Sequence, residues 1–386
     1  MRTISLLQPP LLTYGSGCLA ESSHYLVERG FRNIFVLASP SLSGVFSGLV
    51  EQLRAGGCTV TVDTSCTSEP TLTMFDEVLA RASSTQPVDC VLGIGGGSVL
   101  DLAKLIAAFL GSEQNVRECF GIGFLKSRRC HLVCLPSTSG TGSEVSPNAI
   151  LLDEAEQLKK GVVSRFLVPD ATFIDPELTV SLPSQVTAFT GLDALTHCIE
   201  AYTNKFAHPL VDLYAREGIR LSAEFLVRAV RNGSDIAARE GMSLASMFGG
   251  MCLGPVNTAA VHALAYPLGG EFHIPHGLSN AVLLPSVFRF NAEASPERHA
   301  EVAALLGAPA GQTALATALH GADRLEQLIQ DCGVSTNLAT YGVPKERVPD
   351  MARSAATVTR LLKNNPRDLS VADIEAIYLS CYAKPA

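Results

Sequence analysis

Features that would point to a macromolecular partner are missing from this sequence. Lysine and arginine form no run, and the 386 residues carry a formal net charge of −8. An acidic chain without a basic cluster is poorly suited to bind nucleic acid or an anionic membrane surface. We therefore expect a small-molecule partner, and neither nucleic acid nor a membrane.

Long apolar runs are also missing. No uninterrupted apolar segment approaches the length of a membrane span, and the stretch Ile4–Leu7 is ended by Gln8, Pro9 and Pro10. That stretch is too short for the core of a signal peptide. The protein is expected to be cytoplasmic, and we expect a homodimer.

A paired cysteine framework is the third absence. The eleven cysteines are scattered, and Cys130 and Cys134 are the closest pair. An odd count in an intracellular chain of this size indicates reduced, mostly buried thiols instead of disulfides. Because 47% of the residues are hydrophobic, the chain can bury more than one core, and two domains are expected.

The first half of the chain alternates β-branched runs with helical patterns. Strands are expected at 33–38, 58–63, 89–94, 131–136 and 171–175. Such alternation is typical of parallel strands joined by crossover helices. Residues 1–183 should therefore form an α/β domain with a mostly parallel sheet.

The second half has a different pattern. From Ser184 onward, alanine, leucine and charged residues recur at helical spacing, with breaks at proline and glycine and no convincing strand. Residues 184–386 should form an all-α helical domain.

A glycine-rich segment, Gly95-Gly96-Gly97-Ser98, joins the strand ending at Ile94 to a helical pattern over 99–110. Glycines let the backbone approach a pyrophosphate, and the start of a helix offers free N–H groups. Ser98 and Asp101 also resemble a capping box. The segment is not the G-x-G-x-x-G fingerprint, and an ordinary strand-to-helix turn is the alternative.

A second polar loop, residues 136–144, follows the strand that ends at Pro136. It is rich in serine, threonine and glycine. Small hydroxyls at the carboxyl end of a parallel strand line the ligand site of open α/β sheets. A flexible turn is the alternative. A nucleotide bound by the first loop would, however, need protein contacts on a second side, and this loop lies where those contacts would be.

Four residues in the second half suggest a metal site. Asp193 and His197 are four apart in a helical segment and share one face, while His262 and His276 follow in a second cluster. Three imidazoles and one carboxylate suit Zn²⁺ or Fe²⁺ and leave a position open for substrate. An Asp and a His four residues apart on a helix are more often a surface pair than metal ligands. The prediction of a metal site therefore depends on the second cluster, His262 and His276.

The ordered motifs resemble the iron-dependent (group III) alcohol dehydrogenase family, within the dehydroquinate synthase-like superfamily. The matching segments are Tyr14–Gly17, GGGSVLDLAK at 95–104, PSTSGTGSEVS at 136–146, DPELT at 175–179, GLDALTHCIEAY at 191–202, HALAYPLGG at 262–270, PHGLSNAVLLP at 275–285 and Asn365–Arg367. They span nearly the whole chain. The resemblance implies an alcohol or carbonyl substrate, NAD or NADP, and one divalent metal, Fe²⁺ or Zn²⁺. It also implies that residues 1–183 are the dinucleotide-binding domain and residues 184–386 the metal and substrate domain.

The resemblance also implies roles for individual residues. The positions that match the family's metal ligands are Asp193, His197, His262 and His276. Those that match its cofactor site are Gly95, Gly96, Gly97, Ser98, Asp101, Thr138, Thr141, Ser143 and Lys160.

Two positions depart from the family pattern. Ser39 stands at the end of the 33–38 strand, where NAD-specific relatives often carry an aspartate that repels a 2′-phosphate. Tyr266 stands where several relatives have a histidine that relays the alcohol proton. A phenol can pass a proton, but its ordinary pKa of about 10 makes it a weaker base.

The expected chemistry is metal-assisted hydride transfer between a nicotinamide and an alcohol, aldehyde or ketone, with Tyr266 and His276 at the reacting centre. Domain closure over a cleft should exclude water. The alternatives are a maleylacetate reductase-like enzyme, which generally lacks the full ligand set, a dehydroquinate synthase-like lyase, and a non-catalytic dinucleotide sensor.

Overall fold

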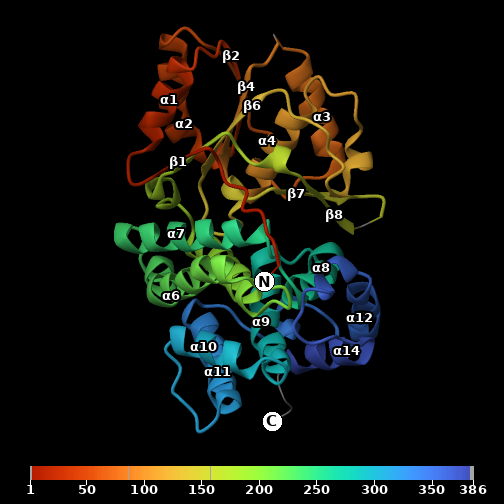
Figure 1. Ribbon diagram of the computed structural model, residues 1–386. Helices are drawn as coiled ribbons and strands as arrows, with labels where there is room; N and C mark the ends of the chain where they lie inside the picture. The colour runs from red at the N-terminus through yellow and green to blue at the C-terminus, as the bar shows by residue number, and fades with distance from the viewer. Residues whose placement is uncertain (1, 86, 157, 383–386) are drawn as a thin grey trace. The chain divides into compact units, whose positions relative to one another are not determined.

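The computed structural model in Figure 1 describes residues 2–85, 87–156 and 158–382. The chain divides into two compact units. One unit is Leu6–Ser181, and the other is Leu182–Ala386 together with Met1–Ser5.

A six-stranded parallel sheet forms the centre of the unit Leu6–Ser181. Its strands are β1 (Leu11–Tyr14), β2 (Asn33–Ala38), β3 (Thr59–Asp63), β4 (Cys90–Gly95), β6 (His131–Pro136) and β9 (Ala171–Ile174). They lie in the order β1-β9-β6-β4-β2-β3, and all adjacent pairs are parallel. From β2 the chain moves to β3 on one side, and from β4 it moves to β6 on the other. The point between β2 and β4 is therefore a topological switch point.

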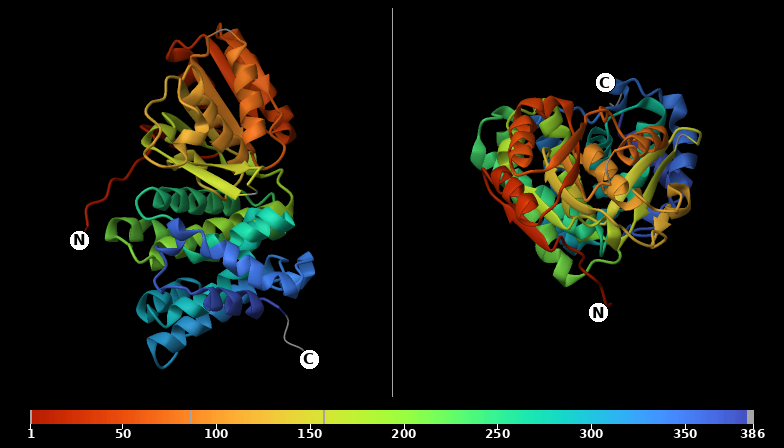
Figure 2. Two further views of the ribbon diagram at one scale, coloured as in Figure 1. Left: turned by 90° about the vertical axis from the view of Figure 1, so that its right-hand side faces the viewer. Right: turned by 90° about the horizontal axis from the view of Figure 1, so that it is seen from above.

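Helices cover both faces of this sheet, as the further views in Figure 2 show. They are α1 (Leu19–Glu28), α2 (Ser43–Ala55), α3 (Leu72–Ser83) and α4 (Gly97–Phe109). Ile34 and Val36 of β2 pack in one core with α1 and α2, whereas Phe35 and Leu37 pack in another with α3 and α4. This alternation follows from the two-residue period of a strand. The predicted α/β unit with a mostly parallel sheet is confirmed.

A smaller sheet was not predicted. It contains β5 (Gly121–Ile122), β7 (Asn148–Asp153) and β8 (Leu158–Val163) in the order β5-β8-β7. β7 and β8 form an antiparallel pair. The five strands that were predicted begin and end within one residue of β2, β3, β4, β6 and β9.

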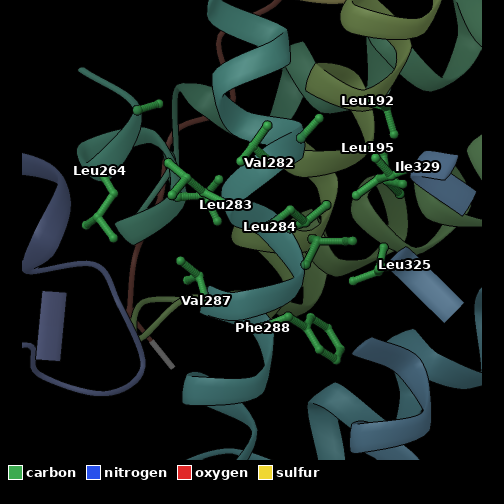
Figure 3. Close-up of a cluster of buried hydrophobic side chains, with 14 of the residues drawn as sticks. Leu192, Leu195, Leu264, Val282, Leu283, Leu284, Val287, Phe288, Leu325 and Ile329 are labelled. Carbon is green, nitrogen blue, oxygen red and sulfur yellow. The ribbon is translucent and has the colours of Figure 1, made fainter. Parts of the chain in front are cut away.

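Helices make up the second unit. They are α5 (Ser184–Thr203), α6 (Pro209–Arg231), α7 (Ile236–Leu253), α8 (Ala260–Phe272), α9 (His276–Ala292), α10 (Pro296–Leu305), α11 (Ala314–Asp331), α12 (Val348–Ala356), α13 (Thr359–Leu362) and α14 (Val371–Ser380). No strand occurs among the described residues of this unit, which confirms the all-helical prediction. Figure 3 shows α9 at the centre of its core, with Val282, Leu283 and Phe288 among side chains from α5, α8 and α11.

The eleven cysteines are all free and buried, as expected from their spacing. Cys198 packs in the helical core, with its Sγ 3.8 Å from the carbonyl oxygen of Ala245. Within the described ranges, none of the helices combines the length and apolar character that a bilayer-spanning segment requires.

Candidate metal centre and cofactor loop

Helix α5 presents the first two residues of the candidate metal centre. Its 20 residues contain no proline, and Leu192, Leu195 and Ile199 are buried on the side facing the core. Asp193 and His197 lie one turn apart and are both buried, at 3% and 5% exposure. The helix therefore places one carboxylate and one imidazole side by side, as the sequence predicts.

The other two residues come from α8 and α9. His262 lies in the first turn of α8, and His276 is the first residue of α9. The sequence placed His276 in a turn, and the structure differs slightly because α9 begins directly after Pro275. A Cβ atom on Gly277 would lie 2.1 Å from the carbonyl oxygen of Phe189 in α5. Only glycine allows α9 to begin this close to α5, and this contact brings His276 to Asp193.

The three imidazoles converge on one oxygen atom of Asp193. Asp193 Oδ1 lies 3.7 Å from His197 Nε2, 3.5 Å from His262 Nε2 and 3.8 Å from His276 Nε2. The rings of His197 and His262 stack with their centroids 4.8 Å apart. Ligand atoms of Asp193, His262 and His276 all lie within 4.8 Å of one another.

The electrostatics of the cluster favour an ionised Asp193. Burial by itself would raise the pKa of this carboxyl group, but His197, His276 and His262 outweigh that effect and hold the pKa well below its usual range. For His262, burial lowers the pKa of the imidazole, whereas Glu200 and Asp193 raise it, to about 9. The buried cluster thus favours positive charge beside Asp193.

Two residues that the sequence analysis did not identify complete this cluster. Glu200 lies on α5 and is 4% exposed, and its Oε2 accepts a hydrogen bond of 2.5 Å from His262 Nδ1. Asn280 lies one turn after His276 on α9, and its Nδ2 donates to Asp193 Oδ1 at 2.7 Å. A local signal for Glu200 was present, because positions 193, 197 and 200 share one helix face.

These side chains fit a divalent metal ion. Ligands held about 2.1 Å from one ion lie roughly 3 to 4 Å apart, which matches the distances around Asp193. Asn280 Nδ2 lies 3.2 Å from His262 Nε2 and 3.4 Å from His276 Nε2, so these two nitrogen atoms face a common region. The two negative charges of the buried Asp193 and Glu200 carboxylates would balance the charge of one divalent cation.

The glycine-rich loop lies in the other unit, at the carboxyl end of β4. Gly96 is the N-cap of α4 and provides no side-chain cap. A Cβ atom on Gly97 would lie 2.4 Å from Thr141 Cγ2, and one on Gly96 would lie 3.1 Å from Thr138 Cγ2. The two predicted cofactor loops are therefore in contact, next to the switch point where α/β sheets bind ligands.

Hydrogen bonds of Asp101 connect helix α4, which follows the glycine-rich loop, to Ser143 and to Ile150 of β7. The Ser143 hydroxyl donates to Asp101 Oδ1, and Asp101 Oδ2 accepts from the backbone N–H of Ile150 at 2.9 Å. The capping box suggested for Ser98 and Asp101 is wrong. Helix α4 begins at Gly97, so Ser98 lies inside it and the Asp101 carboxylate points to Ser143 and Ile150.

The remaining cofactor candidates lie in the same unit. Ser39 directly follows β2, and its backbone N–H donates to the carbonyl oxygen of Ile94 at the end of β4, at 2.9 Å. Lys160 lies on β8 and pairs with Asp153 at 2.9 Å and Glu156 at 2.8 Å. Gly95 ends β4 and is buried.

Tyr266 lies one turn after His262 on α8 and is partly exposed. Its hydroxyl oxygen is 3.5 Å from Arg360 Nη2 on α13. Burial raises the pKa of this phenol, while Arg360 lowers it to a smaller extent.

A parallel-sheet unit with a glycine-rich loop at a strand end, together with a helical unit that has three imidazoles around one carboxylate, is typical of a metal-dependent dehydrogenase. A family model described as iron-containing alcohol dehydrogenase matches residues 9–176, and one described as the C-terminal part of the Fe-containing alcohol dehydrogenase family matches residues 187–382. The chain belongs to the iron-containing alcohol dehydrogenase family. It is a metal-dependent oxidoreductase that transfers a hydride between a nicotinamide cofactor and a small alcohol, aldehyde or ketone.

Relatives match over the whole chain. Long-chain-alcohol dehydrogenase 1 of Geobacillus thermodenitrificans is 38% identical, over 99% of this chain and 98% of its own. Sulfoacetaldehyde reductase of Bilophila wadsworthia is 33% identical, over 95% and 96%. The crystal structure of a 1,3-propanediol oxidoreductase superposes with a TM-score of 0.93 at 32% identity, over 99% of this chain and 100% of that one.

Proposed function

We propose that this enzyme interconverts primary alcohols and aldehydes, with a divalent metal held by Asp193, His197, His262 and His276. The single observation that carries this proposal is the convergence of three imidazole nitrogens on Asp193 Oδ1 within 3.8 Å. Relatives named for a long-chain alcohol, sulfoacetaldehyde and 1,3-propanediol support substrates with a terminal hydroxyl or aldehyde group.

The metal, when bound, supplies Lewis acidity that favours loss of the alcohol proton and polarises a carbonyl group. Asp193 balances charge at the site, and its burial, at 3% exposure, keeps water away from that charge. Oxidation moves a hydride from the carbinol carbon to C4 of the nicotinamide and releases the hydroxyl proton.

We propose Tyr266 as the group that exchanges this proton with solvent. Its raised pKa keeps the phenol protonated at neutral pH, so it is better suited to donate a proton during carbonyl reduction than to accept one during alcohol oxidation. The guanidinium of Arg360 is placed to stabilise the phenolate that donation leaves behind.

For the cofactor, we propose binding by the two loops in contact. Gly95, Gly96, Gly97 and Ser98 would receive the pyrophosphate at the start of α4, with Thr138, Thr141 and Ser143 beside it. Gly96, Gly97, Ser98, Thr138 and Thr141 are all partly exposed, whereas their neighbours are buried. Asp101 would hold the loops together, Ser39 would face the ribose, and Lys160 would lie near the cofactor.

Activity measurements on the same protein without metal and with a defined metal test this proposal. Metal-depleted protein, and protein reloaded with Fe²⁺ without oxygen or with Zn²⁺, is assayed with short and long alcohols and aldehydes and with both nicotinamides. We expect turnover only after reloading, followed by the absorbance of the reduced nicotinamide. Full activity in the metal-depleted protein would refute the metal role, and reloaded protein inactive on every substrate would refute the substrate class. The expected homodimer and cytoplasmic location stay predictions, which light scattering and cell fractionation can test.

A further inference from the structure

We propose that Glu200 is a positioning residue that fixes the tautomer and orientation of His262. Glu200 lies seven residues after Asp193 on α5, so it shares the helix face of Asp193 and His197. It is 4% exposed, and both oxygens of its carboxylate have partners. Oε2 accepts from His262 Nδ1 at 2.5 Å, and Oε1 accepts from the backbone N–H of Val261 at 2.6 Å.

The chemistry of this contact selects one form of the imidazole. A carboxylate only accepts hydrogen bonds, so His262 Nδ1 must carry a proton to bond with Glu200. In the neutral ring, Nε2 is then the unprotonated nitrogen. This is the nitrogen that faces Asp193 Oδ1 at 3.5 Å, so its lone pair points into the metal site. With the other tautomer, a proton on Nε2 would occupy the position of the metal.

The second oxygen has a separate role in the helix. Helix α8 begins after Ala259, whose side chain cannot accept a hydrogen bond. Glu200 Oε1 satisfies the N–H of Val261, one of the unpaired donors in the first turn. Glu200 therefore joins α5 to α8, and a test must separate action through the His262 ring from simple support of α8.

Substitution of Glu200 by glutamine tests the proposal. The Val261 N–H and His262 Nδ1 contact different oxygens of Glu200, and glutamine replaces one of these oxygens with an NH₂ group that donates and does not accept, so one of the two donors loses its acceptor. The dissociation constant for Zn²⁺, measured by competition with a coloured chelator, should rise about 10- to 100-fold in Glu200→Gln. Glu301→Gln is the matched control, because Glu301 accepts from Tyr202 at the end of α5 without a described contact to the four ligands. Its Zn²⁺ affinity should equal that of the wild type.

A double-mutant cycle separates the two roles of Glu200. If Glu200 acts through the His262 ring, Glu200→Gln should have no further effect on Zn²⁺ affinity in a His262→Ala background. If Glu200→Gln lowers Zn²⁺ affinity equally in the wild type and in His262→Ala, Glu200 acts by supporting the fold of α8, and the proposal is overturned.

A measurement on the unaltered enzyme covers the case in which Glu200→Gln fails to fold. In Zn²⁺-loaded wild type labelled with ¹⁵N-histidine, NMR should show a proton on His262 Nδ1 and none on Nε2, and the reverse pattern would overturn the proposal. The inference rests on the proposed metal site. Wild type that binds no Zn²⁺ would refute that site, whereas equal binding by wild type and Glu200→Gln would refute only the role of Glu200.

Discussion

Ser39 is the residue from which we predict cofactor preference. It follows β2 beside the switch point, and its hydroxyl lies 2.9 Å from that of Ser41. Neither side chain would repel a 2′-phosphate, so NADP(H) should be accepted at least as well as NAD(H).

The substitution Ser39→Asp tests this. It should depress kcat/KM for NADPH more than for NADH, because an added carboxylate repels the phosphate. A ratio of the two kcat/KM values equal to that of the wild type would show that Ser39 does not face the ribose.

Tyr266 offers a second test at the residue scale. If its hydroxyl exchanges the substrate proton, Tyr266→Phe should lower kcat about 10²-fold or more with little change in melting temperature. Tyr266→His should move the alkaline limb of the pH–rate profile toward neutrality, because an imidazole has a lower ordinary pKa than a phenol.

A packing role for Tyr266 predicts the opposite pattern. Tyr266→Phe would then leave kcat nearly unchanged, and Tyr266→His would lower the melting temperature through a poorly satisfied imidazole. The rate against pH and the melting curve of both variants decide between the two roles.

Single residues differ in how far the sequence reveals their role. Asp193 and His197 could be recognised as a pair because four residues form about one helical turn. Glu200 was passed over because its partner, His262, is 62 residues away and only the folding of α8 against α5 brings them together. Asn280 was missed for the same reason, since its contact with Asp193 joins α9 to α5.

At the scale of elements, the start of α4 should tolerate no side chain at Gly97. A Cβ atom there would meet Thr141 Cγ2 at 2.4 Å, so Gly97→Ala should separate the two cofactor loops. We expect the dissociation constant for NAD(P)H, measured by fluorescence titration, to rise at least 10-fold and the melting temperature to fall by a few degrees.

Two further variants control this prediction. Gly44→Ala introduces the same change at an exposed position of α2. An added Cβ atom there would meet no atom of another part of the described structure within 4 Å, so cofactor binding should stay unchanged. Adding Thr141→Ala to Gly97→Ala removes the nearest atoms, and the closest remaining one is Thr141 Cβ at 3.0 Å, so stability should partly recover. Unchanged cofactor affinity in Gly97→Ala would contradict the account of this loop.

The strands show which elements a sequence can reveal. Apart from Asn33 and His131 at their first positions, β2, β4 and β6 contain no polar side chain because helices cover both faces of the sheet, and this made them recognisable. β8 begins with Leu158-Lys159-Lys160-Gly161 and lies in the small sheet, so it lacks that pattern. β1 has four partly buried residues at the sheet edge, and β5 has only two residues. β1, β5 and β8 are short or largely only partly buried, and such strands depend on tertiary pairing, which the local sequence does not specify.

At the scale of the whole molecule, buried His299 should make folding stability depend on pH. Burial lowers the pKa of its imidazole from the ordinary 6.5 to about 4, although its hydrogen bond with the Ser295 carbonyl opposes this. Between pH 6.5 and 4 the unfolded chain takes up a proton that the folded chain does not. Stability from this group is therefore full above pH 6.5 and is lost as the pH falls, by about 3 kcal/mol in total.

The variant His299→Asn removes the titrating group and can still donate to the Ser295 carbonyl, which His299 Nδ1 contacts at 2.7 Å. Urea unfolding at several pH values should give a shallower loss of stability between pH 6.5 and 4 than in the wild type. Parallel curves for the two proteins would show that His299 is not the group responsible.

The central claim is that four side chains from α5, α8 and α9 hold one divalent metal. Elemental analysis of purified wild type beside His276→Ala tests it most directly, because His276 supplies one ligand and is the most exposed of the four, at 28% of its side chain. The wild type should contain about one Fe²⁺ or Zn²⁺ per chain, and His276→Ala, with a melting curve close to that of the wild type, should contain much less. Equal metal content in the two proteins would contradict the account.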